Sequence, residues 1–201
     1  MNVYDESNFV LELALFQDQW KSCEEILNLC EAKRVQLVVP AYSLTEPYET
    51  LTRRQKQRKS IKEDLDVELR QIARSATQRD RAHRFGDLTA LLINIADEET
   101  NNLEQVRSRL MNSASVLPLD SSVLAVSTQY QRKHGFSPQD ALVYSSVLCH
   151  LEQVRTPQSC FLNRNSKDFD DQNIVEELGS FNCVLLPRFD HGYGYILNAL
   201  R

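Results

Sequence analysis

The sequence predicts an α/β fold in three layers, with a central parallel sheet of about five strands and helices on both faces. Short apolar runs suited to buried strands recur along the 201 residues, and segments with helical spacing of apolar residues separate them. Parallel neighbours need a crossover connection that is usually helical, so this alternation indicates a parallel sheet. A polar helical stretch, residues 52–115, interrupts it. We expect one domain, residues 1–201, with this stretch as an insertion.

Composition narrows the class of protein. An apolar content of 42% is enough for a sizeable core, and only 5 Gly and 6 Pro argue against a β-sandwich or a disordered chain. The net charge of −5 means that any nucleic-acid binding must come from a local basic patch. The five widely spaced cysteines form no C-x-x-C motif, which favours buried free thiols in a reducing compartment.

No targeting or spanning segment is expected. The sequence has no run of about 18 apolar residues and no charged-then-apolar start. We therefore expect a cytoplasmic protein that neither spans nor binds a membrane.

The first half of the fold is predicted to hold two strands, each leading into helix. An apolar run at residues 1–4 meets Asp5 and Glu6, and a helix opens at Asn8. The nearly all-apolar segment 35–40 is typical of a strand buried on both faces. Two long polar helical segments come next, from about 44 to 76 and from about 80 to 111, which predicts a helical hairpin.

The second half restores the alternation of strands and helices. Residues 116–119 are expected to form a third strand, and Asp120 starts a helix that ends near Gly135. Ser137 and Pro138 are a good N-cap and first residue for the next helix. The remaining expected elements are a strand at 159–162, a short helix at 171–178 and a strand at 182–186.

Four acids are expected at one edge of the sheet. Glu6, Glu46 and Asp168 each follow a predicted strand, and Asp140 opens a helix near the same edge. In open α/β sheets ligands bind beyond the carboxyl ends of the strands. Crowded carboxylates repel one another, and a divalent cation relieves the repulsion; oxygen-rich sites select Mg²⁺ or Mn²⁺.

Each acid also has an ordinary structural explanation. Glu46 and Asp140 both lie three residues after a serine, so each could complete a capping box. Asp5 and Glu6 could be a solvated strand end, and Asp168 could lie in a polar loop. No histidine has metal-ligand spacing with these acids, which argues against zinc, and no phosphate-binding glycine motif is present.

The ordered motifs resemble those of PIN-domain nucleases. Glu6-Ser7-Asn8 opens an apolar helix, Ser43-Leu-Thr-Glu46 follows the second strand, Ser137-Pro-Gln-Asp140-Ala141 starts a later helix, and Arg164-Asn165-Ser-Lys-Asp168-Phe169 follows the fourth. The similarity covers both ends of the chain and omits the helical insert. Glu6 departs from the family's usual Asp, which lengthens that ligand by one methylene.

The resemblance implies a metal-dependent endoribonuclease. Glu6, Glu46, Asp140 and Asp168 would hold Mg²⁺ or Mn²⁺ directly or through water, and Asn8, Asn165 and Asp5 would support them. The resemblance also implies RNA as the substrate, a homodimer, and the toxin of a toxin–antitoxin pair with an antitoxin-like protein partner as one further role.

A basic run at the start of the insert suits an RNA substrate. Residues 53–62 hold six cations and no acid, and Arg53, Arg54, Lys56 and Arg58 are the expected phosphate contacts. A solvated helix face explains the same run. The alternative function is a PIN-like scaffold that is catalytically weak or inactive and binds RNA or protein.

Overall fold

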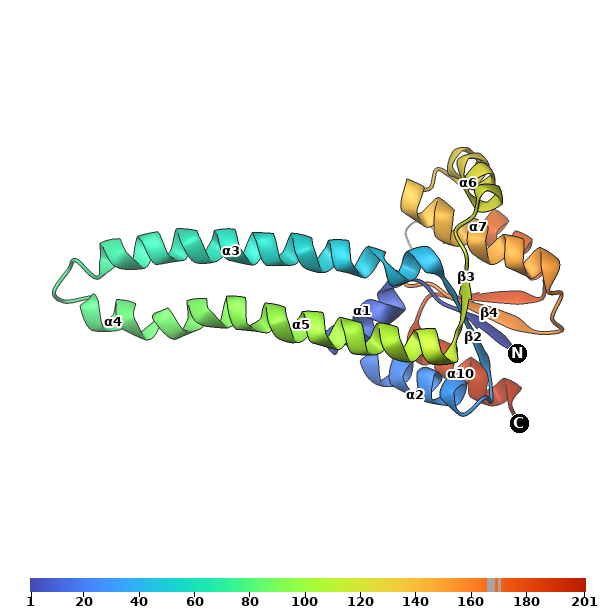
Figure 1. The fold of residues 1–201 in the computed structure, drawn as a ribbon, viewed down its shortest axis with the longest axis horizontal. Helices are drawn as coiled ribbons and strands as arrows, with labels where there is room; N and C mark the ends of the chain where they lie inside the picture. Colours follow the sequence, from blue (N-terminus) through green and yellow to red (C-terminus); the bar gives the residue numbers. More distant parts are fainter. Residues whose placement is uncertain (166–168, 170) are drawn as a thin grey trace.

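Five parallel strands form the centre of the molecule in the order β3-β2-β1-β4-β5 (Figure 1). This computed structural model describes residues 1–165, 169 and 171–201, without the side chains of residues 83, 86–90, 92 and 93. The strands are β1 (Asn2–Tyr4), β2 (Gln36–Pro40), β3 (Ser115–Leu117), β4 (Ser159–Leu162) and β5 (Cys183–Leu186). The predicted parallel sheet is therefore confirmed.

Helices connect the strands. They are α1 (Ser7–Leu15), α2 (Trp20–Glu31), the 3-10 turn η1 (Ala41–Leu44), α3 (Glu46–Ile72), α4 (Arg79–Arg84), α5 (Gly86–Ser113), α6 (Ser121–His134), α7 (Pro138–Gln153), α9 (Gln172–Gly179) and α10 (Phe189–Ala199). In the described part of the chain, no helix is long and apolar enough to cross a membrane.

Two apolar cores lie on opposite faces of the sheet. Successive strand residues point to opposite faces, so Val3 and Leu37 join one core while Tyr4 and Val38 join the other. Helices α1, α2 and α10, with the base of the α3–α5 hairpin, cover the first face. Helices α7 and α9 cover the second. The predicted arrangement in three layers is thus confirmed.

The long helices α3 and α5 run side by side away from the sheet (Figure 1). Their bases are anchored in the first core, where Leu51 of α3 and Leu103, Val106 and Leu110 of α5 are buried. Farther out the pairing becomes polar, because the Arg58 guanidinium binds both carboxylate oxygens of Glu99 at 2.5 and 2.8 Å. That residues 52–115 are an insertion within a single domain stays a prediction.

The cysteines are free, as the sequence predicts. Cys23, Cys30, Cys160 and Cys183 are buried, and Cys149 is half-buried. Burial raises the pKa of the Cys149 and Cys183 thiols, to about 12 for Cys183. Because the thiolate is the reactive form, these side chains act as small apolar groups of the core.

Candidate functional site

A cavity of about 230 Å³ lies at the carboxyl edge of the sheet, where β1, β2 and β4 end. It is lined by residues far apart in the sequence. Three of the four predicted acids belong to the lining, together with both predicted supporting amides. The lining residues are Glu6, Ser7, Asn8, Leu11, Glu46, Thr50, Ser137, Gln139, Asp140 and Asn165.

Glu6 is held at the end of β1 by backbone donors. It is the N-cap of α1, where its Oε2 accepts a hydrogen bond from the Asn8 N–H at 2.8 Å. Its Oε1 accepts from the Arg164 N–H at 3.2 Å. Burial raises the pKa of Glu6 to about 7, and the charge of Glu46 adds to this effect, while the hydrogen bonds from Asn8 and Arg164 oppose it.

Glu46 points at the cavity and does not complete a capping box. The predicted Ser43–Glu46 box is wrong, because Thr45 precedes α3 without a side-chain cap and the buried Ser43 hydroxyl has no hydrogen-bond partner among the residues that the structure describes. The Ser7 hydroxyl instead donates to Glu46 Oε2. Burial raises the pKa of Glu46, and the nearby charge of Asp140 raises it further. The electrostatic coupling indicates that the cavity's acids repel one another.

Asp140 serves the helix and the cavity together. Ser137 is the N-cap of α7, and its hydroxyl accepts from the Asp140 N–H at 3.1 Å and donates to Asp140 Oδ2 at 2.5 Å. Only the serine's half of the predicted capping box is therefore present, because Asp140 bonds the Ser137 hydroxyl and not the Ser137 N–H. The other oxygen, Oδ1, accepts from Asn165 Nδ2 at 3.1 Å. Asn165 thus fixes the carboxylate's orientation from the segment after β4.

The remaining two predicted acids, Asp168 and Asp5, do not line the cavity in the described part of the chain. Asp168 lies outside the described residues. Asp5 is fully buried beneath the cavity, and neither carboxylate oxygen has a hydrogen-bond partner in the described part of the chain. Burial raises the pKa of Asp5 well above its usual range, and the charge of Glu6 contributes. Asp5 is therefore not among the cavity's lining residues.

An ion pair beneath the site was not predicted from the sequence. The Arg164 guanidinium donates to Glu12, whose side chain is fully buried in α1 and also accepts from the Gln19 N–H at 2.7 Å. Since the Arg164 N–H also holds Glu6, this residue links the interior acid to the cavity acid. The one available signal was an acid within the apolar helix SNFVLELAL.

The basic run divides between two sides of α3. Arg53 and Lys56 line a second cavity of about 440 Å³ together with Tyr48, Glu49 and Thr52. The charge of Arg53 also acts on Glu46 and lowers its pKa against the larger effect of burial. Arg54 and Arg58, by helical spacing, lie on another side, and Arg58 is bound to Glu99. Arg53 is thus a cation of this run whose charge reaches an acid of the cavity, and Lys56 lies beside it in the second cavity.

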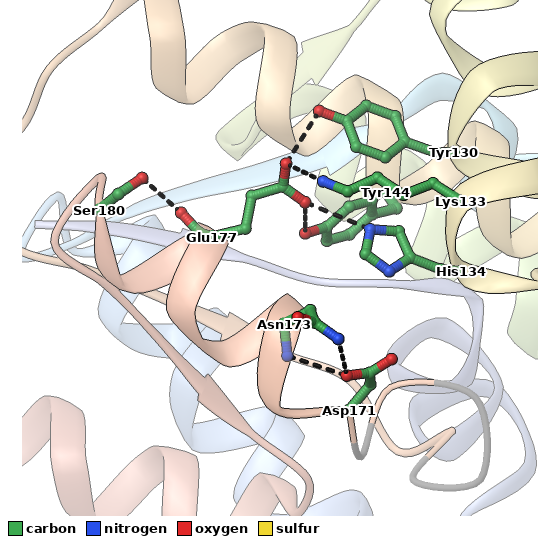
Figure 2. Close-up of polar contacts among 8 residues, drawn as sticks. All are labelled: Tyr130, Lys133, His134, Tyr144, Asp171, Asn173, Glu177 and Ser180. Atoms are coloured by element: carbon green, nitrogen blue, oxygen red, sulfur yellow. Dashed lines mark hydrogen bonds and ion pairs between the residues drawn. The ribbon is translucent and has the colours of Figure 1, made fainter.

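A polar cluster on the second face fixes α9 against α6 and α7 (Figure 2). The Glu177 carboxylate accepts from Lys133 at 2.7 Å and Tyr144 at 2.9 Å, and contacts Tyr130 and His134 at 3.3 Å. Burial alone would raise the pKa of Glu177, but the hydrogen bonds and the Lys133 charge outweigh it and lower the pKa.

The same helix is capped at its start. The Asp171 carboxylate accepts from the Asn173 N–H at 2.8 Å (Figure 2). The contacts of Glu177 therefore bind α9 to α6 and α7. Asp171 is therefore a helix cap here, and Glu177 lies apart from the cavity.

The donor atoms of the cavity suit a hard divalent cation. Glu6, Glu46 and Asp140 offer carboxylate oxygens, and Asn8 and Asn165 offer amide oxygens, which are the ligands that Mg²⁺ and Mn²⁺ prefer. The raised pKa of Glu6 and Glu46 is the electrostatic state that a cation would relieve. Among the described residues, however, no group of three or more His, Cys, Asp or Glu side chains is arranged to hold a metal ion.

Comparison with known proteins identifies the class. The model of the family described as PIN domain matches residues 3–169, so this chain belongs to the PIN domain family, whose members are generally nucleases. A comparison with curated proteins found no match.

One solved structure that aligns with this chain is the crystal structure of VapBC2 from Rickettsia felis bound to a DNA fragment from their promoter. The alignment covers 92% of this chain and 98% of that one, with 11% identity and a TM-score of 0.46. At this level of similarity, the ligand of that complex carries no implication for this chain.

Proposed function

We propose that this protein is a metal-dependent endoribonuclease that hydrolyses RNA phosphodiester bonds. The observation that carries the proposal is the gathering of Glu6, Glu46 and Asp140, from three separate elements, around one cavity at the carboxyl edge of the sheet. Membership in a family of nucleases supports the reaction class. The type of nucleic acid rests on the resemblance of the sequence motifs to those of PIN-domain nucleases.

The cavity's acids would hold Mg²⁺ or Mn²⁺. Glu6, Glu46 and Asp140, with Asp168 as the fourth acid, are the ligands, directly or through water. The bound ion would lower the pKa of a water molecule and stabilise the charge of the phosphodiester transition state. Asn165 keeps the Asp140 carboxylate oriented, and the Asn8 and Arg164 N–H groups do the same for Glu6. Asp5, the neighbour of Glu6 in the chain, would support the site from the interior.

Arg53 and Lys56 would position the substrate. They line the cavity next along α3, so a strand whose scissile phosphate lies at the acids would pass its neighbouring phosphates over them. Arg54 and Arg58 remain candidates of lower rank, because they lie on another side of α3 and Arg58 is paired with Glu99. We further assign the protein to the cytoplasm, in accord with its free thiols.

The test is cleavage of a fluorogenic RNA during titration with Mn²⁺ or Mg²⁺. Asp140→Asn preserves the size of the side chain and should lower the rate at least about a hundredfold, because it removes the charge of one ligand. Asp97→Asn, on the exposed surface of α5, is the matched control and should cleave like the wild type. Metal-independent cleavage, or equal activity of the two variants, would contradict the proposal.

One observation favours a second function. Because no three-acid group arranged to hold a metal ion is found among the described residues, the alternative is a PIN-like scaffold that binds RNA or protein without efficient catalysis. RNA binding with full affinity in the absence of metal, and no cleavage with it, would favour the scaffold. A toxin role requires an antitoxin-like partner, which co-purification from the native host would detect.

A further inference from the structure

The end of the α3–α5 hairpin that lies farthest from the sheet is rich in arginine (Figure 1). Residues 70–85 hold five arginines, no lysine and one acid, so this segment has a net charge of +4 in a chain whose net charge is −5. The segment comprises the end of α3, the turn after it and α4, and is called the hairpin tip. Its arginines are Arg70, Arg74, Arg79, Arg81 and Arg84.

The tip arginines are available to a ligand. All five are exposed, and none forms an ion pair within the part of the chain that the structure describes. Arg70 and Arg79 each donate one hydrogen bond to a backbone oxygen, at 3.0 and 3.3 Å, and Arg74 donates one to Gln71 at 3.1 Å. Because a guanidinium has five N–H donors, most donors remain for a partner.

Stability of the chain alone does not explain this arrangement. Arg81 and Arg84 lie three residues apart in α4, and like charges at that spacing destabilise a helix. The tip is nevertheless a folded corner, because α4 packs against both α3 and α5 and Ala82 is buried. A fixed backbone therefore holds together cations that repel one another, and a bound anion would relieve the repulsion.

The residue types of the tip favour phosphate as that anion. Arginine binds phosphate through two parallel N–H groups, which lysine cannot do. Hydroxyl and amide side chains also lie among the arginines, and such groups contact the phosphates and sugars of nucleic acids. They are Gln71, Ser75, Thr77 and Gln78.

The tip lies on the side of α3 that also carries the second cavity. Arg70 follows Thr52 by 18 residues, which is five full turns, so the two lie on one side of the helix about 27 Å apart. Thr52 lines the second cavity together with Arg53 and Lys56. Two cations between the cavity and the tip are paired with acids of α3, as Lys59–Glu63 and Lys62–Asp66. The unpaired cations of this side therefore gather at its two ends.

We propose that the hairpin tip is a second binding site for the phosphate backbone of RNA, remote from the acidic cavity. Glu46 lies in the first turn of α3 and Arg74 lies just beyond its last residue, so the two sites are about 40 Å apart. The substrate is then an RNA long enough to place phosphates at both sites. The cleavage part of this inference rests on the proposed nuclease function, whereas phosphate binding at the tip requires neither metal nor cleavage.

Two sites on one protein bind a long RNA more tightly than either site alone. Once one site is occupied, the other meets the same RNA at a high effective concentration. At about 3.4 Å per stacked nucleotide, an RNA of about six nucleotides covers about 20 Å and reaches one site only. An RNA of about 40 nucleotides reaches both. The protein should therefore prefer long RNA, and the preference should depend on the tip.

Fluorescence anisotropy of a labelled RNA of about 40 nucleotides, with the full chain in EDTA, measures binding without cleavage. The tip variant carries Arg74→Gln, Arg81→Gln and Arg84→Gln. It should raise the Kd at least about tenfold and lower the slope of log Kd against log salt by about 2, since each phosphate contact contributes about 0.7.

The matched control removes the same charge from exposed arginines outside the tip. It carries Arg34→Gln, Arg132→Gln and Arg155→Gln, and these arginines also form no ion pair in the described part of the chain. The control should bind the long RNA like the wild type. Equal weakening by the tip variant and the control would mean that only the total charge matters, and would overturn the tip site.

Cleavage kinetics in Mn²⁺ then test whether the tip acts as a separate contact. The ratio of KM for the long RNA to KM for an RNA of about six nucleotides should rise at least about tenfold in the tip variant. An equal rise of KM for both lengths would refute a remote site. If no RNA is cleaved but binding in EDTA still depends on the tip, the nuclease proposal fails and the tip site stands.

A lipid surface is the other source of phosphate groups. Co-sedimentation with phosphatidylserine vesicles, compared between the wild type and the tip variant, distinguishes it from RNA. Vesicle binding that the tip variant loses, together with RNA binding that it retains, would assign the arginines to a membrane and overturn the proposal.

Discussion

The raised pKa of the buried Glu6 carboxyl group predicts that the protein loses stability as pH rises from about 4.5 to 7. Glu6 is 6% exposed, and its folded-state pKa is raised from 4.5 to about 7. Between these values the folded chain holds a proton that the unfolded chain has released, so the free energy of unfolding falls as pH rises. At 1.36 kcal/mol per pKa unit, the loss from this group is about 3 kcal/mol and is complete just above pH 7.

Urea unfolding of the metal-free protein at several pH values between 4.5 and 8 measures this effect. Asp5 and Glu46 change stability in the same direction, because their pKa values are raised too, so the informative quantity is the difference between variants. Relative to the wild type, Glu6→Gln should gain about 3 kcal/mol as pH rises across this range, because glutamine does not titrate. Glu98→Gln, on the exposed surface of α5, should follow the wild type.

Repeating the urea unfolding with added divalent cations tests whether the same acids bind a metal ion. At pH 8 the wild-type acids are charged, so millimolar Mg²⁺ or Mn²⁺ should raise the urea midpoint in proportion to binding, and the gain should shrink in Glu6→Gln. If the free energies of unfolding of the wild type and Glu6→Gln change in parallel with pH, the pKa of Glu6 is not raised in the folded protein. If neither cation stabilises the wild type, the acids do not form a metal site.

Two further predictions concern the support of the site and of the sheet. Arg164→Met should lower the free energy of unfolding by about 2 kcal/mol, which is less than for a wholly buried pair because Arg164 is 35% exposed. In a double-mutant cycle of urea unfolding, Glu12→Gln in the same chain should recover part of this loss. Strict additivity of the two changes would refute the pairing. Gly192→Ala should lower the free energy of unfolding by about 1 to 3 kcal/mol, because an added Cβ would lie 2.5 Å from Leu162 Cδ2. Gly194→Ala is the control: its added Cβ meets no atom within 4 Å, so it should be neutral or stabilising. Equal thermal midpoints of the two variants would contradict this packing.

The sheet was predictable because each strand is a short apolar run, and burial on both faces requires that composition. Glu6, Asp140 and Asn165 were predictable as neighbours because the carboxyl ends of parallel strands share one edge. The Ser43–Glu46 capping box failed for a tertiary reason. Ser7, 39 residues away, donates to Glu46, and no local motif contains that information.

Two other features lay beyond the reach of local motifs. The Glu12–Arg164 pair joins residues 152 positions apart, and the apolar helix around Glu12 gives no sign of its partner. The cations of residues 53–62 suggested phosphate contacts when considered alone. The structure shows that they lie on different sides of α3 and that Arg58 is bound to Glu99, 41 residues away.

The continuity of α3 also makes it a lever with unequal arms. Glu46 lies in its first turn, and Leu51, fixed in the core, is the natural pivot about 8 Å farther along, while Ile72 is about 30 Å beyond it. A rigid tilt that swings the outer end by about 4 Å therefore shifts the Glu46 carboxylate by only about 1 Å. Because a misplacement of about 1 Å can lower a reaction rate about a hundredfold, a contact at the far end of the hairpin would be felt at the acidic cavity.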